Sequence, residues 1–182
     1  NDESDSAQAV TRDYTFEVTT DSGKLPLLSV FGGKITTYRK LSQAAVDKLC
    51  EFFPEAAAPW TDKATLPGGN FNTREELQAQ LQDEFSWLPT KTIARFVRSY
   101  GTMSYQLLGT AENLADLGTD FGAGLYQQEV DYLITYEWAS TLEDVIWRRT
   151  KMGLYLSSDQ NLVLEQYIAE KFAKASVSDQ GA

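Results

Sequence analysis

The residues of this chain best suited to chemistry form one short run, residues 27–41. An apolar, strand-like segment ends at Gly32 and Gly33 and is followed by Lys34, two threonines and the start of an amphipathic helix. Glycine has no Cβ, so a ligand can approach the backbone closely, and a helix start offers unpaired N–H groups and the positive end of a dipole. With the charge of Lys34, the pattern favours binding of an anionic or electron-rich group. A tight turn before a capped helix is the alternative, and the glycine-to-lysine spacing is not that of a Walker loop.

Other charged or glycine-containing segments give weaker signals. Arg12 stands at the head of a strand-like run, where a solvated surface position is the simplest interpretation. Asp144 and Arg148 are four residues apart on a predicted helix and are expected to form a weak ion pair. The following Arg-Arg-Thr segment, 148–150, is interpreted as a polar network that holds helices together. Loop 114–124 contains glycines but follows no strand, so it is predicted to connect helices rather than bind a nucleotide.

Composition excludes several classes of function. The 182 residues carry a formal charge of −10 and include no histidine and a single cysteine. Such an acidic chain is not expected to bind nucleic acid, which requires a basic surface. Without histidine, proton transfer within this chain needs Lys, Tyr, Asp or Glu, and most zinc sites are excluded, so no metal site is predicted. Cys50 lies in a helical pattern and is predicted to be a small buried side chain.

The N-terminal residues are predicted to form a β-hairpin. Tyr14, Phe16 and Val18 alternate with polar residues, and residues 25–31 form a second strand-like run after a turn. Because a lone hairpin is marginal in water, we expect it to belong to a sheet that this chain does not supply. The sequence is therefore expected to be a fragment of a longer protein, with residues 1–37 as the last hairpin of a missing domain.

From residue 38 to residue 182 the pattern indicates a helical domain. Helices are predicted near residues 38–53, 73–85, 89–100, 102–109, 123–138, 141–152 and 158–175. Thr36 or Thr37 is expected to cap the first helix, and Thr73, Ser140 and Ser157 each begin a capping-box signature. The predicted fold class is mainly α: a helical bundle preceded by a β-hairpin.

Three segments together resemble the FAD-dependent glycerol-3-phosphate dehydrogenases. They are Phe-Gly-Gly-Lys-Ile-Thr-Thr at 31–37, Thr-Arg-Asp-Tyr at 11–14 after an acidic run, and Arg-Arg-Thr at 148–150. The resemblance runs from residue 2 to about residue 172. It implies that residues 1–37 are the C-terminal hairpin and flavin-contacting turn of an α/β FAD-binding domain. Residues 38–182 would then be the helical C-terminal domain of the same protein.

The resemblance also implies roles for individual residues. Arg12 would bind the phosphate of glycerol 3-phosphate, because a guanidinium offers a planar fork of donors to a phosphate dianion. Lys34 would be a catalytic and substrate-binding residue that polarises a substrate oxygen. The residues implied to contact the flavin are Gly32, Gly33, Lys34, Ile35 and Thr36.

The family's reaction oxidises glycerol 3-phosphate to dihydroxyacetone phosphate by hydride transfer to FAD, and electrons pass to a quinone. The implied location is cytoplasmic, peripheral on the inner membrane surface, and a homo-oligomer is compatible with the sequence. Because the dinucleotide fingerprint and a histidine base are absent, these 182 residues alone are expected neither to hold FAD tightly nor to turn over substrate. The alternative is a non-catalytic, acidic helical interaction module. The sequence leaves open whether the helical part covers the active site, mediates oligomerisation or docks a partner.

Overall fold

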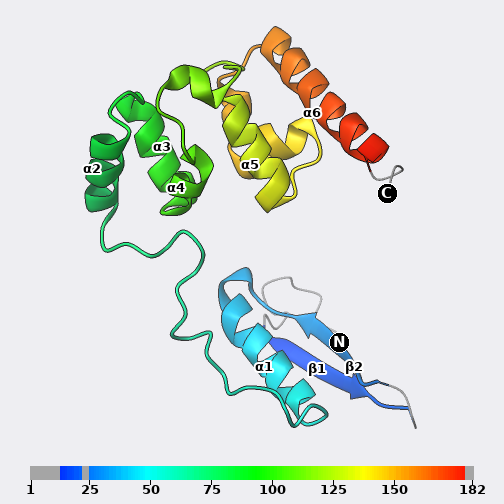
Figure 1. Ribbon diagram of the computed structural model, residues 1–182. Helices are drawn as coiled ribbons and strands as arrows, with labels where there is room; N and C mark the ends of the chain where they lie inside the picture. The colour runs from blue at the N-terminus through cyan, green and yellow to red at the C-terminus, as the bar shows by residue number, and fades with distance from the viewer. Residues whose placement is uncertain (1–12, 22–24, 179–182) are drawn as a thin grey trace, which may run out of the picture. The chain divides into compact units, whose positions relative to one another are not determined.

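The structure, a computed structural model, describes residues 13–21 and 25–178 of the chain, with side chains as far as residue 173. It divides into two units, one ending at Ala64 and one beginning at Thr65. The predicted fold class, a β-hairpin followed by a helical bundle, is confirmed (Figure 1). The division groups helix α1 (Tyr38–Cys50) with the hairpin, whereas the sequence pattern puts a boundary after residue 37.

The first unit consists of an antiparallel hairpin and helix α1. Strand β1 (Tyr14–Thr19) pairs with strand β2 (Leu27–Gly32) in a register that sets Tyr14 opposite Gly32 and Thr19 opposite Leu27. None of the described residues of this unit is buried. Large apolar side chains are therefore left exposed to solvent; they include Leu25, Leu27, Val30, Phe31 and Ile35.

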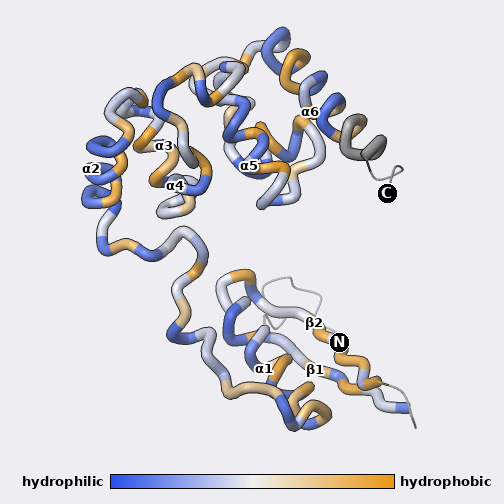
Figure 2. The backbone as a smooth tube through the Cα atoms, in the orientation of Figure 1, coloured by the Kyte–Doolittle hydropathy of each residue, from blue (hydrophilic) through white to orange (hydrophobic). Residues whose placement is uncertain are grey.

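The second unit is a bundle of short helices. Its α-helices are α2 (Arg74–Glu84), α3 (Thr90–Tyr100), α4 (Met103–Leu108), α5 (Gln127–Glu137) and α6 (Ser158–Ser178). Two 3-10 helices, η2 (Leu114–Leu117) and η4 (Met152–Leu154), and a π-helix, η3 (Asp144–Arg149), lie between them. Hydrophilic and hydrophobic residues alternate along α2 and α6 (Figure 2), as expected of helices with one buried face. These faces meet in one apolar core, whose most deeply buried members include Leu77, Phe96, Leu108, Leu125, Leu133 and Leu164.

Side-chain caps fix the starts of several helices. The predicted caps at Thr73 and Ser157 are confirmed: Thr73 Oγ1 accepts from the Glu76 N–H at 3.2 Å, and Ser157 Oγ accepts from the Gln160 N–H at 3.3 Å. The Gln160 side chain completes the second box by accepting from the Ser157 N–H at 2.9 Å. Each such cap contributes roughly 1 kcal/mol to helix stability.

The predicted box beginning at Ser140 is displaced by one residue. Thr141 Oγ1 accepts from the Asp144 N–H at 3.2 Å, and Asp144 Oδ2 accepts from the N–H groups of Ser140 and Thr141. The bond from the Ser140 backbone and that from the Thr141 hydroxyl, with Arg148 nearby, hold the pKa of Asp144 far below its usual range. The predicted cap of the first helix is wrong as well. The Thr37 hydroxyl donates to the Lys34 carbonyl at 2.8 Å, because a 3-10 turn precedes α1.

Two predicted helices differ from the observed ones. The helix expected at 123–138 begins only at Gln127, because Gly122, Ala123 and Gly124 all have positive φ. The helix expected at 141–152 is a π-helix that ends at Arg149. The Thr150 hydroxyl there donates to the Val145 carbonyl at 2.6 Å, and Lys151 takes the left-handed conformation. The expectation that Cys50 is buried is also wrong, since Cys50 is half-buried in a unit with no buried described residue.

A buried ion pair joins α3 to α5. Glu129 is fully buried, and its two carboxylate oxygens accept from both terminal nitrogens of Arg95, at 2.6 Å for Nη2 and Oε2. The Tyr100 hydroxyl donates to Glu129 Oε1 at 2.5 Å, and Arg95 Nη2 also donates to the Gly124 carbonyl at 2.8 Å. The carboxylate is thus paired by charge and by three donors, which a buried ion requires.

The cluster shifts the titration of two of its members. Burial and then the Glu129 charge raise the pKa of Tyr100 well above its usual value of 10.0. Burial by itself lowers the pKa of Arg95, but the hydrogen bond and the attraction to Glu129 outweigh burial, so the pKa of Arg95 is raised overall. The arginine of the cluster is therefore held in its charged form and the tyrosine in its neutral form.

Replacement of Glu129 by alanine is expected to destabilise the second unit severely. The Arg95 guanidinium and the Tyr100 hydroxyl would lose their acceptor inside the protein, a loss that costs about 3–5 kcal/mol. Urea unfolding of the chain, followed by far-UV circular dichroism, measures this loss. The control is Lys171→Ala, which breaks the exposed pair between Lys171 and Asp131 and is expected to cost at most about 1 kcal/mol. Equal losses in the two variants would contradict the central role of Glu129.

Tyr100 should make stability depend on pH in alkali. Because its pKa is raised in the folded state, the folded chain holds this proton more tightly than the unfolded chain. The resulting stability is fully present below pH 10 and is lost as pH rises through the folded pKa. Above pH 10 the free energy of unfolding of the wild type should fall more steeply than that of Tyr100→Phe. Parallel curves from urea unfolding at a series of pH values would show that Tyr100 does not carry this dependence.

Candidate functional site

The predicted ligand-contacting residues all lie in one exposed turn of the first unit. Gly32 ends β2 with a φ of 78°, and Gly33 follows with a φ of 101°. A Cβ on Gly32 would lie 2.6 Å from the Asp13 carbonyl oxygen, and one on Gly33 would lie 2.8 Å from Leu41 Cδ1. Both glycines are therefore required by the fold of the turn itself, as well as by any ligand that approaches it.

The turn leads directly into a helical start. Lys34 is extended and exposed, and its carbonyl accepts from the Thr37 N–H at 3.0 Å. Ile35 and Thr36 open the 3-10 helix η1 (Ile35–Thr37), so their N–H groups have no acceptor within the helix. Ile35 is 89% exposed. The arrangement presents backbone donors and one lysine on an open surface, which is suited to an anionic or electron-rich group.

The five consecutive residues Gly32, Gly33, Lys34, Ile35 and Thr36 thus form a single turn that runs from the end of β2 into η1. Arg12, the predicted phosphate-binding residue, lies outside the described residues. The flavin, substrate and catalytic roles of all six residues stay predictions. Within the described ranges 13–21 and 25–173 there is no group of three or more acidic or cysteine side chains that could hold a metal ion. No helix in the described part of the chain is long and apolar enough to cross a membrane.

The Arg-Arg-Thr segment has the structural role predicted for it. Arg149 donates through Nε and Nη2 to the Glu137 carbonyl, at 3.0 and 2.8 Å, and so ties η3 to the end of α5. Arg148 pairs with Asp144 at 2.9 Å, the predicted i,i+4 ion pair. Both arginines are therefore engaged within the bundle.

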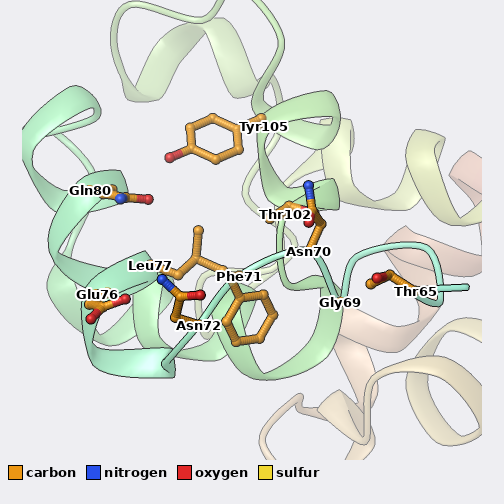
Figure 3. A pocket seen from close by; sticks show the side chains of 10 residues that line it. All are labelled: Thr65, Gly69, Asn70, Phe71, Asn72, Glu76, Leu77, Gln80, Thr102 and Tyr105. Atoms are coloured by element: carbon orange, nitrogen blue, oxygen red, sulfur yellow. The ribbon is translucent and has the colours of Figure 1, made fainter. Parts of the chain in front are cut away.

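A polar cavity in the second unit escaped the sequence analysis. It has a volume of about 520 Å³ and lies where the segment 65–72 passes α2 and the start of α4 (Figure 3). The residues that line it are Thr65, Gly69, Asn70, Phe71, Asn72, Glu76, Leu77, Gln80, Thr102 and Tyr105. Asparagines in a loop and an exposed helix face gave no periodic signal, so nothing in the sequence marked this cavity.

The fold defines the class of protein: a helical domain that follows a β-hairpin and an exposed glycine turn. Residues 59–179 match the family described as the C-terminal domain of alpha-glycerophosphate oxidase, and the chain belongs to this family.

Several relatives resemble the chain over most of its length. It is 48% identical over 169 residues to a glycerol-3-phosphate dehydrogenase of Pseudomonas aeruginosa, covering 92% of this chain and 33% of that protein. It is 43% identical over 171 residues to the aerobic glycerol-3-phosphate dehydrogenase of Escherichia coli, covering 93% and 34%. A D-erythritol 1-phosphate dehydrogenase of Brucella abortus is 38% identical over 161 residues, covering 87% and 32%. The chain spans about a third of the length of these relatives.

Gly32→Ala is expected to disrupt the turn. Alanine at a positive φ costs about 1–2 kcal/mol, and its Cβ would in addition meet the Asp13 carbonyl at 2.6 Å. Gly109→Ala serves as the matched control, because Gly109 also has a positive φ but its Cβ would find the nearest atom at 3.5 Å. Amide hydrogen exchange around each site should show a larger loss of protection at β1 and β2 in Gly32→Ala than at α4 in Gly109→Ala. Similar losses would mean that the close approach to Asp13 has no energetic weight.

Proposed function

We propose that the chain is the C-terminal part of an FAD-dependent enzyme that oxidises glycerol 3-phosphate to dihydroxyacetone phosphate and passes the electrons to a quinone. The observation that carries the proposal is the similarity to the two glycerol-3-phosphate dehydrogenases, at 48% and 43% identity. Its 169 aligned residues exceed the length of the second unit, so the similarity extends into the unit that holds the glycine turn.

The geometry of the turn fits one edge of a flavin. FAD would accept a hydride from the substrate carbon and gain negative charge on its ring system. The N–H groups of Ile35 and Thr36 would donate to that edge, and the missing side chains of Gly32 and Gly33 would let the ring lie close to the backbone. Lys34 would hold charge near the ring and polarise the substrate oxygen.

The first unit offers further support for a larger protein around this site. Its described residues include none that is buried, and apolar residues of β2 such as Val30 and Phe31 stand exposed, at 42% and 54%. A hairpin of this kind gains stability by packing in a larger sheet, as the FAD domain of the proposed enzyme would provide. Arg12 is the proposed partner of the substrate phosphate.

Substrate and setting are parts of the same proposal. The erythritol phosphate relative shares the phosphorylated polyol class, but its lower identity favours glycerol 3-phosphate. We include in the proposal a cytoplasmic location, peripheral at the inner membrane surface, and self-association as a homo-oligomer. The alternative function, a non-catalytic acidic interaction module, would give the exposed N–H groups and Lys34 of the glycine turn no ligand to bind.

Lys34→Ala in the full-length protein tests the proposal. Loss of a charged group that faces the reacting atoms is expected to lower kcat about 100-fold or more and to shift the visible absorbance of the bound flavin. Lys48→Ala removes the same charge from the other end of α1 and should leave both unchanged. Steady-state oxidation of glycerol 3-phosphate with a quinone analogue and the absorbance spectrum are the measurements. Unchanged turnover and spectrum in Lys34→Ala would refute the role of the turn.

A further inference from the structure

The cavity of the second unit has the composition of a binding site. Its lining is dominated by side chains that can both donate and accept hydrogen bonds: three amides, two threonine hydroxyls and the phenol of Tyr105. Gln80 and the Tyr105 hydroxyl point toward one another across it, with Leu77 beneath them (Figure 3). Its volume of about 520 Å³ falls within the range of roughly 300–1,000 Å³ that is usual for small-molecule sites.

The polar groups of this cavity are not engaged by the protein. Within the described part of the chain, no side chain that lines it has a hydrogen-bond partner. Comparable amides elsewhere in the unit are used: Gln128 donates to the carbonyls of Leu107 and Leu108, and Gln160 caps α6. The cavity amides are therefore available to a ligand, whereas those of Gln128 and Gln160 are used within the protein.

Close backbone contacts and a helix cap support the wall of the cavity. Gly68 has a φ of 83°, and its carbonyl accepts from the Thr102 N–H at 2.9 Å. A Cβ on Gly101 would lie 1.9 Å from that carbonyl oxygen, so the two segments touch only because both residues are glycines. The Thr73 cap fixes the start of α2, which carries Glu76 and Gln80. Preorganised walls reduce the ordering cost of binding.

Charge restricts the class of ligand. Among the described residues that line the cavity there is no lysine or arginine, and one carboxylate, Glu76, stands at its edge. Burial and then the charge of Glu84 raise the pKa of Tyr105, so the field of a second carboxylate reaches this wall of the cavity. An anion such as a phosphate ester would be repelled here, whereas a neutral ligand is tolerated.

We propose that this cavity binds an uncharged polyol or sugar. Hydroxyl groups of such a ligand match the mixed donors and acceptors of Asn72, Gln80 and Tyr105. Its C–H faces match the apolar surface of the partly buried Phe71. The site lies within the second unit and takes unphosphorylated ligands, so it does not depend on the proposed oxidation of glycerol 3-phosphate.

Saturation-transfer NMR on the 182-residue chain tests the site, with glycerol, erythritol, glucose and maltose as probes. Saturable binding of at least one of them is expected. Asn72→Leu and Gln80→Leu, both at exposed positions that should fold normally, are each expected to weaken it by about fivefold or more. Gln166→Leu makes the same change on an exposed turn of α6 outside the cavity and should leave the affinity unchanged. Circular dichroism checks the fold of all three variants.

Three results would overturn the proposal. One is the absence of saturable binding for every uncharged probe at millimolar concentration. The second is binding that Asn72→Leu and Gln80→Leu leave unchanged. The third is tighter binding of a charged probe, glycerol 3-phosphate or spermidine, than of any uncharged one. Since loss of flavin chemistry in Lys34→Ala concerns the other unit, either proposal can fail while the other stands.

Discussion

The fully buried carboxylate of Glu129 is the constraint on which the helical unit depends. An ion without water must be paired, and the chain supplies Arg95, Tyr100 and the Gly124 carbonyl to complete the cluster. These partners come from α3 and from the loop before α5. Satisfying one charge therefore fixes the approach of two helices and the path of the segment between them.

This constraint explains a departure from simple helical periodicity. Arg95 needs a carbonyl in reach, and the backbone from Gly122 to Gly124 turns with positive φ to present one. Residues 123–126 are consequently unavailable to α5, which begins at Gln127. The same turn places Leu125 in the core with no exposed surface. The burial of Leu125 and the pairing of Arg95 with the Gly124 carbonyl thus favour the same conformation of this loop.

Local signals in the sequence were sufficient for most elements. Alternation predicted the hairpin, and capping boxes at Thr73 and Ser157 predicted two helix starts, because these depend on residues only a few positions apart. The failures share a different cause. The shift of the cap from Ser140 to Thr141, the π-helix η3 and the buried Glu129 depend on partners distant in sequence or on competition between neighbouring side chains. One available signal was missed: Glu129 lies beside Val130 and four residues before Leu133, on the apolar side of a helix.

The two candidate sites were predictable to different degrees because one depends on neighbouring residues and the other on residues distant in sequence. The glycine turn is encoded by adjacent residues, so the sequence alone showed where Gly32, Gly33 and Lys34 would meet. The cavity is assembled from a loop and two helices. Its wall depends on the contact between Gly68 and Gly101, and nothing in the sequence indicates that these two distant glycines meet. The turn stands on a unit without a buried described residue, whereas the cavity stands on a unit with a core. The turn therefore has no packed core beneath it in the described part of its unit, whereas the walls of the cavity belong to elements that pack on the core of the bundle.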